Sequence, residues 1–344
     1  MYSMGSWSRT WMAMLAVALA AGSAWAQGRP SGDPGADPKQ GQQPPGQPDT
    51  SGVAPRSVPG PETAAEDAAG EHVRRREDIT YRPTIEERQD FDCRLIGSME
   101  ALILGKESLN AKATILSKAT AQNADGTVRV AYKIVDGLCD IGGKQKTVGK
   151  KDTILYADFD PRHQMLKVEN ANSTEVPEDG KKDKLDLGTI LLYVCTSVAF
   201  HERSMGEGTH WSAEYQTIDA NGRKLRMSGE HDLVEFLPDG DRRVAVIHSV
   251  LTIPVMGKAG SFDVAGKLDC DVLSEVYVDT GELRYRRAVC SGTLHSLVAL
   301  DIPRLEAWVR LLRDGQPVAS LHEPDALPQL PPPEVRPEPE EGQG

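Results

Sequence analysis

The sequence predicts a mainly β protein, an antiparallel meander of long strands that folds as a curved sheet or half-barrel. Apolar and polar residues alternate along several long runs, which is typical of strands with one buried face. Turn dipeptides separate these runs, and two of them, Asn221-Gly222 and Asp239-Gly240, are favoured in two-residue hairpin turns. Two apolar segments with a different pattern add helices, one near 185–201 and one near 303–313.

The first 26 residues have the features of a secretory signal peptide. Arg9 precedes an apolar run over 11–21, and the small residues Ala24 and Ala26 stand just before Gln27. The run is about half of the ~20 residues that a membrane-spanning helix needs, so we expect no transmembrane anchor. We therefore predict that residues 1–26 are removed and that the protein is exported, to a periplasm or to the extracellular space.

Two further segments have compositions that cannot build a core. Residues 27–70 are rich in Pro, Gly and Gln with almost no bulky apolar residue, which predicts a disordered spacer. Residues 323–344 contain six acidic residues and seven prolines, which predicts a disordered acidic tail. Residues 71–322 are then the β-rich folded domain. The chain has a formal net charge of −12, and without a clustered basic face we expect no nucleic-acid partner.

Strands are expected at each alternating run. In 128–134, four apolar residues alternate with Arg129, Ala131 and Lys133, directly after the turn Asp125-Gly126. The other expected strands are 109–120, 154–159, 164–170, 209–218, 223–237, 242–255, 261–278 and 283–298.

The segment 185–201 predicts a buried helix. It is apolar and too long for an ordinary strand, whereas its uninterrupted apolar part is too short to cross a bilayer. A helix that packs against the sheet satisfies both observations.

The segment 303–313 predicts a C-terminal amphipathic helix. Pro303 stands at its start and Gly315 just beyond its end, as is common at helix boundaries. Four apolar residues fall at the i, i+3, i+4, i+7 spacing of one helix face: Leu305, Trp308, Val309 and Leu312.

Two segments, 156–168 and 275–285, both have the pattern of a strand, an acidic turn and a second strand. They lie on either side of 185–201 in the sequence. One continuous meander and two related β halves joined by the helix are therefore both compatible with the sequence.

The sequence also resembles known proteins. The blocks 276–284 (VYVDTGELR) and 208–211 (GTHW) resemble those of secreted bacterial β-meander proteins of uncharacterised function. More distantly, the layout of residues 90–300 is similar to that of the LolA/LppX-type periplasmic lipid carriers. This resemblance implies a curved antiparallel sheet around an apolar cavity, with a helix across its open side. It transfers no functional residue.

Five cysteines lie in the expected folded domain, and Cys270 and Cys290 flank the hairpin around Thr280-Gly281. A three-residue loop with a glycine bulge puts these two cysteines opposite each other, where a disulfide can form. A two-residue loop shifts the pairing by one residue and puts the thiols on opposite faces. Export favours the first register, and the cleaner separation of apolar from charged side chains favours the second. Cys270 and Cys290 are the candidate disulfide.

His210, His231 and His248 fall on three successive expected strands. If both favoured hairpin dipeptides form two-residue turns, His231 lies opposite His248 and His210 lies diagonal to His231, about 7–8 Å away on the same face. One hypothesis is a Zn²⁺ site formed by the three histidines, with Glu214 as a fourth ligand or base. The other is that one register differs, or that each histidine has its own hydrogen bond.

Motifs for common catalytic chemistries are missing from the sequence, including the Gly-x-Ser-x-Gly elbow, His-Glu-x-x-His and the phosphate-binding loop. The function we expect is an exported non-enzymatic carrier or binding module, which holds an apolar small molecule or lipid beneath the helix 185–201 and needs no cofactor. One alternative is a structural or adaptor module that contacts an envelope protein. The other is a metal-dependent hydrolase that uses the three histidines.

Overall fold

The structure is a computed structural model that describes residues 76–101, 105–148, 154–171, 185–259, 262–296 and 299–322. The predicted signal peptide 1–26, the spacer 27–70 and the acidic tail 323–344 lie outside the described residues.

The described residues form thirteen strands and one α-helix, α2 (Leu187–Thr196). The strands are β1 (Arg88–Ala101), β2 (Gly105–Gln122), β3 (Val128–Ile141), β4 (Lys144–Val148), β5 (Ile154–Phe159), β6 (Met165–Asn170), β7 (His210–Ile218), β8 (Lys224–Asp239), β9 (Arg242–Ala259), β10 (Phe262–Tyr277), β11 (Leu283–His295), β12 (Leu300–Arg313) and β13 (Gln316–Pro317).

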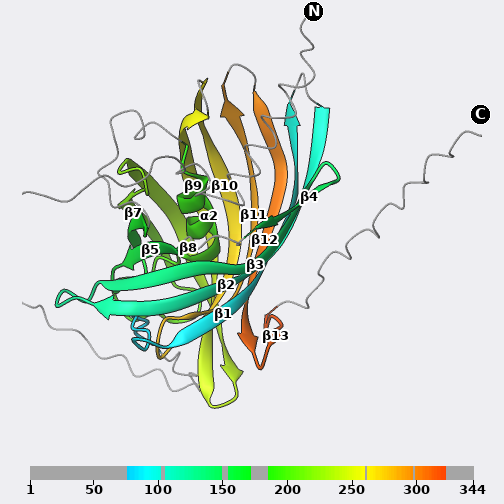
Figure 1. The fold of residues 1–344 in the computed structure, drawn as a ribbon. Coiled ribbons are helices and arrows are strands. Elements are labelled where there is room, and N and C mark those ends of the chain that lie inside the picture. Colours follow the sequence, from blue (N-terminus) through cyan, green and yellow to red (C-terminus); the bar gives the residue numbers. More distant parts are fainter. Residues whose placement is uncertain are drawn as a thin grey trace, which may run out of the picture. The chain divides into compact units, whose positions relative to one another are not determined.

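Eleven of the described strands close into a barrel (Figure 1). From β1 to β12 each strand pairs with its neighbour in the chain, except that β5 takes the place of β4 beside β3. The ring closes where β12 pairs with β1 from Phe91 to Ala101. The pairings are antiparallel apart from a single parallel pair, Lys167 with Ile218, which joins β6 to β7. The prediction of a mainly β antiparallel meander is confirmed, and the curved sheet closes on itself.

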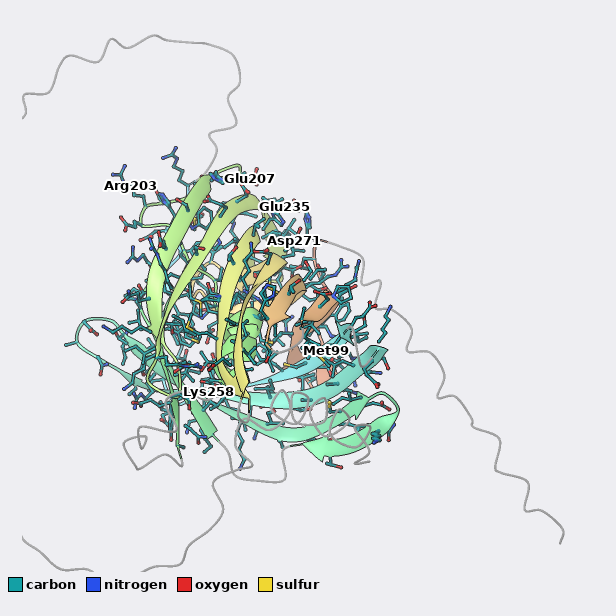
Figure 2. The ribbon with its side chains drawn as sticks, turned by 90° about the horizontal axis from the view of Figure 1, so that it is seen from above. Met99, Arg203, Glu207, Glu235, Lys258 and Asp271 are labelled. Atoms are coloured by element: carbon teal, nitrogen blue, oxygen red, sulfur yellow. A yellow bond between two sulfur atoms is a disulfide. The ribbon has the colours of Figure 1, made fainter. Side chains whose placement is uncertain are left out.

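The helix predicted at 185–201 is confirmed over Leu187–Thr196. Asp186 caps its first turn, because the carboxylate accepts a hydrogen bond from the Thr189 N–H at 3.1 Å. α2 packs against β11 and β12, and the view from above shows it within the ring of strands (Figure 2). The helix is therefore part of the barrel's core.

The helix predicted at 303–313 is wrong, because this segment lies within β12. Leu305, Ala307 and Val309 alternate toward the core, while Trp308 and Arg310 on the opposite face are also buried. With both faces buried, apolar residues occupy positions that match helix spacing as well as strand spacing. The extended form is favoured because β12 makes ladders with β1 on one edge and with β11 on the other.

The chain before β1 crosses one end of the barrel. The Tyr81 N–H donates to the Pro161 carbonyl at the β5–β6 turn, and the Arg82 N–H donates to the Thr280 carbonyl at the β10–β11 turn. Glu77 forms a bridge with Met205 in the connection after α2. These contacts join turns from separate parts of the ring, so this end of the barrel is covered by the chain itself.

Glycines let neighbouring strands approach closely at the other end. A Cβ atom on Gly97 of β1 would lie 2.7 Å from the Arg304 carbonyl oxygen and 2.8 Å from Leu305 Cδ1 of β12. A Cβ atom would lie closer still to a backbone oxygen at Gly266, 2.3 Å from that of Thr293, and at Gly292, 2.2 Å from that of Lys267. Close approach of this kind is a common reason for glycine within a strand.

We expect Gly97→Val to lower the free energy of unfolding by about 1–3 kcal/mol, the usual cost of overpacking a closely packed site. The measurement is urea unfolding of both proteins. Ser98→Val is the matched control, because the next side chain along β1 points to the opposite face. Equal losses of unfolding free energy in Gly97→Val and Ser98→Val would show that the close approach of β12 does not require a glycine at position 97.

Candidate functional site

The inner wall is aliphatic at the end of the barrel where β1, β2, β10, β11 and β12 extend beyond α2 (Figure 1). Six inward-facing side chains there are 2–7% exposed. We call these residues the aliphatic wall: Met99, Leu109, Val264, Leu268, Leu294 and Ile302. One acidic residue, Glu107, pairs with a member of the aliphatic wall: it lies opposite Met99, near the start of β2. Below this rim the wall presents hydrocarbon and glycine.

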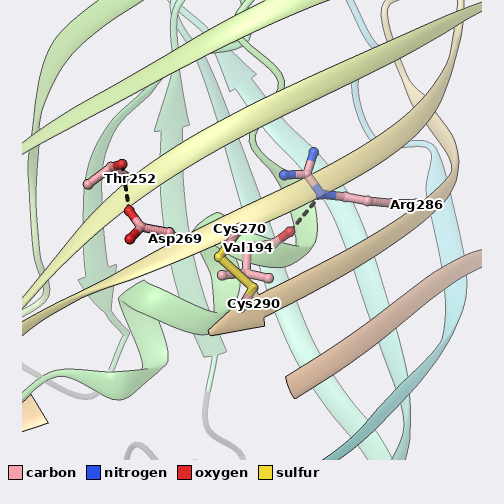
Figure 3. Close-up of a disulfide and its surroundings, with 6 residues drawn as sticks. All are labelled: Val194, Thr252, Asp269, Cys270, Arg286 and Cys290. Atoms are coloured by element: carbon pink, nitrogen blue, oxygen red, sulfur yellow. Dashed lines mark hydrogen bonds between the residues drawn. A yellow bond between two sulfur atoms is a disulfide. The ribbon is translucent and has the colours of Figure 1, made fainter. Parts of the chain in front are cut away.

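A buried arginine lies on the same inner face. Arg286 of β11 is 1% exposed, and its Nε donates a hydrogen bond to the Val194 carbonyl at 2.6 Å (Figure 3). Its Nη1 donates to the Ser197 carbonyl at 2.8 Å and to Ser274 Oγ at 3.0 Å. Both carbonyls belong to the C-terminal end of α2, where the helix dipole is negative. Arg286 therefore fixes the end of α2 to the barrel wall.

The partners of Arg286 are two carbonyls and a hydroxyl, so within the described ranges its charge has no carboxylate counter-ion. Its Nη2 is buried and has no hydrogen-bond partner among those residues. Burial lowers the pKa of Arg286 to about 10, so the side chain is charged at neutral pH. An unpaired buried charge is costly, and the helix dipole compensates it only in part.

Two neutral histidines share this part of the interior. His163 stacks on Tyr81 with ring centroids 4.0 Å apart, and His231 stacks on Trp211 at 5.3 Å. Burial, followed by the charge of Arg286, lowers the pKa of His163 to about 3 and that of His231 to about 4. Neither imidazole adds charge near Arg286 at neutral pH.

The three candidate metal ligands do not meet. His231 faces the interior, where its Nδ1 lies 2.8 Å from Ser249 Oγ. His210 and His248 are on the outer face, each 2.9 Å from a carboxylate oxygen of Asp232 and Asp271 respectively. Glu214, the proposed fourth ligand, forms an ion pair with Arg226. Across the ranges that the structure describes, no three His, Cys, Asp or Glu side chains gather as a metal site would require.

The cause is a one-residue difference in both hairpin registers. Asp232 pairs with His210 on one side and with His248 on the other. The first loop is longer than two residues because the Asp219 carboxylate accepts hydrogen bonds from the N–H groups of Asn221 and Arg223. The second turn is Gly240-Asp241 and not the predicted Asp239-Gly240, because Asp239 pairs with Arg242, and the register then shifts at an irregularity between Leu233 and Glu235. A one-residue slip moves every side chain to the opposite face.

Cys270 and Cys290 form a disulfide across β10 and β11 (Figure 3). At the cysteines the pairing is that of the first alternative. The predicted three-residue loop is wrong, because a shift near the turn pairs Val276 with Leu283 and places Arg284 outside the ladder. The register with cleaner faces is wrong because the inner face itself holds polar side chains, Ser274 opposite Arg286. The disulfide lies on the inner face between Arg286 and the aliphatic wall.

A buried charge cluster on the outer face holds the C-terminal segment. Glu275, which is 0% exposed, accepts hydrogen bonds from Ser320 Oγ at 2.6 Å and from the Leu321 N–H at 2.7 Å. Its other carboxylate oxygen accepts from Arg284 Nη1 at 2.6 Å. Hydrogen bonds, first that from Arg313, hold the pKa of Asp239 in this cluster far below its usual range. Every donor and acceptor named here is used within the chain, so this cluster is structural.

Comparison with known protein families, characterised proteins and solved structures finds no match for the chain. The resemblance to secreted β-meander proteins and lipid carriers therefore stays a prediction. The described part of the chain contains no helix with the length and apolarity to cross a membrane.

We expect Arg286→Met to lower the free energy of unfolding by about 2–5 kcal/mol, because the Val194 and Ser197 carbonyls lose their donor at about 1–3 kcal/mol each. Urea unfolding measures the loss. Arg287→Met, one residue along β11 and on the opposite face, is the matched control and should cost less than about 1 kcal/mol. An Arg286→Met protein as stable as the wild type would show that α2 does not depend on this contact.

Stability should fall as the pH drops from about 6.5 to about 4, because the unfolded chain binds a proton at His231 in this window and the folded protein does not. His231→Gln can keep a hydrogen bond to Ser249 but does not titrate. The slope of the free energy of unfolding against pH should therefore decrease by up to about 1.4 kcal/mol per pH unit.

His210→Gln is the control for this titration. The hydrogen bond with Asp232 raises the pKa of His210, so this exposed residue contributes stability that is present at low pH and lost at higher pH. The His210→Gln protein should therefore lose at least as much stability as the wild type when the pH drops from about 6.5 to about 4. If the free energy of unfolding of His231→Gln has the same slope against pH as that of the wild type, His231 is not a buried, neutral imidazole in the folded protein.

Proposed function

We propose that this protein is an exported, non-enzymatic carrier or binding module that holds an apolar, lipid-like ligand inside the barrel. The observation that carries the proposal is the aliphatic wall, a set of buried hydrocarbon side chains on five strands beyond α2. Small-molecule sites are mostly apolar with a few polar groups that orient the ligand. Hydrocarbon walls of this kind favour a ligand that itself consists largely of hydrocarbon.

The barrel's dimensions support this proposal. About eight strands give an interior that side chains alone can fill, and larger barrels leave space. This ring has eleven strands, and α2 fills the part nearest Arg286. The opposite end is covered by the chain around Tyr81 and Arg82. A ligand would therefore enter at the end formed by the aliphatic wall.

The disulfide supports export. Disulfides form and persist in oxidising compartments and are rare in the cytosol. Cys270 and Cys290 are bonded in this structure, which agrees with the signal peptide that the first 26 residues predict.

A structural or adaptor role in the cell envelope is the second candidate, and one observation favours it. Histidines and acids alternate across the outer faces of β7 to β10, where His210 pairs with Asp232 and His248 pairs with Asp271. These side chains are 37–69% exposed. Such a row could contact an envelope protein. The metal-dependent hydrolase has no such support, because its three histidines lie on two faces.

The delipidated protein should bind a fluorescent fatty-acid probe at one molecule per chain, and unlabelled fatty acid should displace it. Ile302→Gln places an amide in the aliphatic wall and should weaken binding at least about tenfold, because a buried amide without a partner costs about 1–3 kcal/mol. Val250→Gln is the matched control, since Val250 is 49% exposed on the outer face of β9. Failure of the folded wild type to bind the probe would contradict the carrier proposal and leave the adaptor.

A further inference from the structure

We propose that Cys93 of β1 and Cys195 of α2 form a second disulfide, which attaches the C-terminal end of the helix to the barrel wall. This inference rests on export, which is part of the proposed function, and does not depend on what the barrel holds. Three observations carry it: the position of β1 beside the last turn of α2, the interaction between the two thiols, and the register that separates the remaining thiol, that of Cys139, from Cys93.

The last turn of α2 is attached to the wall at two places, and β1 lies between them. On one side, Arg286 of β11 donates hydrogen bonds to the carbonyls of Val194 and Ser197 (Figure 3). On the other side, the hydroxyl of Tyr132 on β3 is hydrogen-bonded to the side chain of Thr196. From one attachment to the other the strands follow in the order β11, β12, β1, β2 and β3. β1 is therefore the middle strand of the wall beside this turn.

Cys93 lies on the inner face of β1, in the same cross-strand row as Arg286. It pairs with Val309 of β12, which in turn pairs with Arg286 of β11. Two strand spacings of about 4.8 Å put the backbones of Cys93 and Arg286 about 10 Å apart. The guanidinium holds the carbonyls on either side of Cys195. On its other side Cys93 pairs with Ala113, a small residue, and both thiols keep some accessible surface.

The two thiols act on each other. Burial raises the pKa of Cys93 well above its ordinary value, and the charge of Cys195 raises it further, by more than the carboxylate of Asp92 does. Asp92 is the residue next to Cys93 in the chain. Because the interaction between two charges falls with distance, a thiol that outweighs this carboxylate lies close to Cys93. Burial also raises the pKa of Cys195, to about 11.

The register keeps Cys139 away from Cys93. Cys139 of β3 pairs with Ala111 of β2, which pairs with Leu95 of β1 and not with Cys93. Two strand spacings are about 10 Å, whereas the Cα atoms of a disulfide lie about 4.4–6.8 Å apart. A bond between Cys93 and Cys195 therefore leaves Cys139 as the single thiol that an odd number of cysteines requires.

The bond forms by thiol–disulfide exchange with a protein oxidant of the exported compartment. One thiolate attacks the disulfide of the oxidant to form a mixed disulfide, and the thiolate of the other cysteine then displaces the oxidant. The two cysteines lose two protons and two electrons, and the oxidant leaves as a dithiol. The product closes a loop of about 100 residues, against a separation of 20 for Cys270–Cys290, and a longer loop removes more entropy from the unfolded chain.

The experiment uses the full chain, exported to a bacterial periplasm. The cells are precipitated with acid, and the protein is unfolded without a reductant in the presence of N-ethylmaleimide, which labels each free thiol. We expect one label, on Cys139, and two disulfides, each of which lowers the mass by about 2 Da through the loss of two hydrogens. Proteolysis should yield a peptide that contains Cys93 linked to Cys195.

The number of labels separates this proposal from export. Three labels, with Cys270 and Cys290 bonded, would overturn the second disulfide and leave export standing. Five labels would overturn both.

Cys139→Ser is the matched control. It should have no label, whereas Cys93→Ser and Cys195→Ser should each have two. If Cys195 is instead bonded to Cys139, Cys139→Ser would have two labels and Cys93→Ser none, and the assignment to Cys93 would be overturned. The linked peptide from the wild type gives the same answer without any variant, so the test does not depend on whether a variant folds.

Discussion

The width of the barrel is the constraint on which the rest of the structure depends. A ring of eleven strands encloses more space than its own side chains fill, since about eight strands are the limit for that. α2 supplies the missing core, and its end is bound to the wall by Arg286. The connection that carries α2 also places β7 beside β6 in parallel. Without the helix, the part of the interior around Arg286 would lack the residues that fill it.

This arrangement divides the interior into two chemically different parts. Around the end of α2 lie aromatic rings, neutral histidines and the buried charge of Arg286. Beyond α2 lies the aliphatic wall, with glycines that let neighbouring strands approach closely. Arg286 is a structural residue at the boundary of these two parts, since its Nε and Nη1 hold the end of α2.

The sequence predicted what depends on local pattern and missed what depends on pairing. The alternation in 128–134 identified a strand, and the apolar run that contains α2 identified a helix. The spacing in 303–313 fits both a helix and a strand, and only its pairing with β1 and β11 decides between them. The histidine row failed because loop hydrogen bonds at Asp219 and an irregularity in β8 changed both registers. Arg286 was missed for a related reason. The register that forms the disulfide places it on the inner face, but the cleaner separation of charges opposed that register.

The central claim is the proposal that the barrel holds an apolar, lipid-like ligand. Native mass spectrometry of the full chain, exported to a bacterial periplasm and purified without detergent, tests this most directly. The account predicts a mass that exceeds that of the oxidised polypeptide by one lipid-like molecule, with the adduct lost on denaturation. A bare polypeptide mass, from protein that is folded and has its disulfide intact, would contradict it.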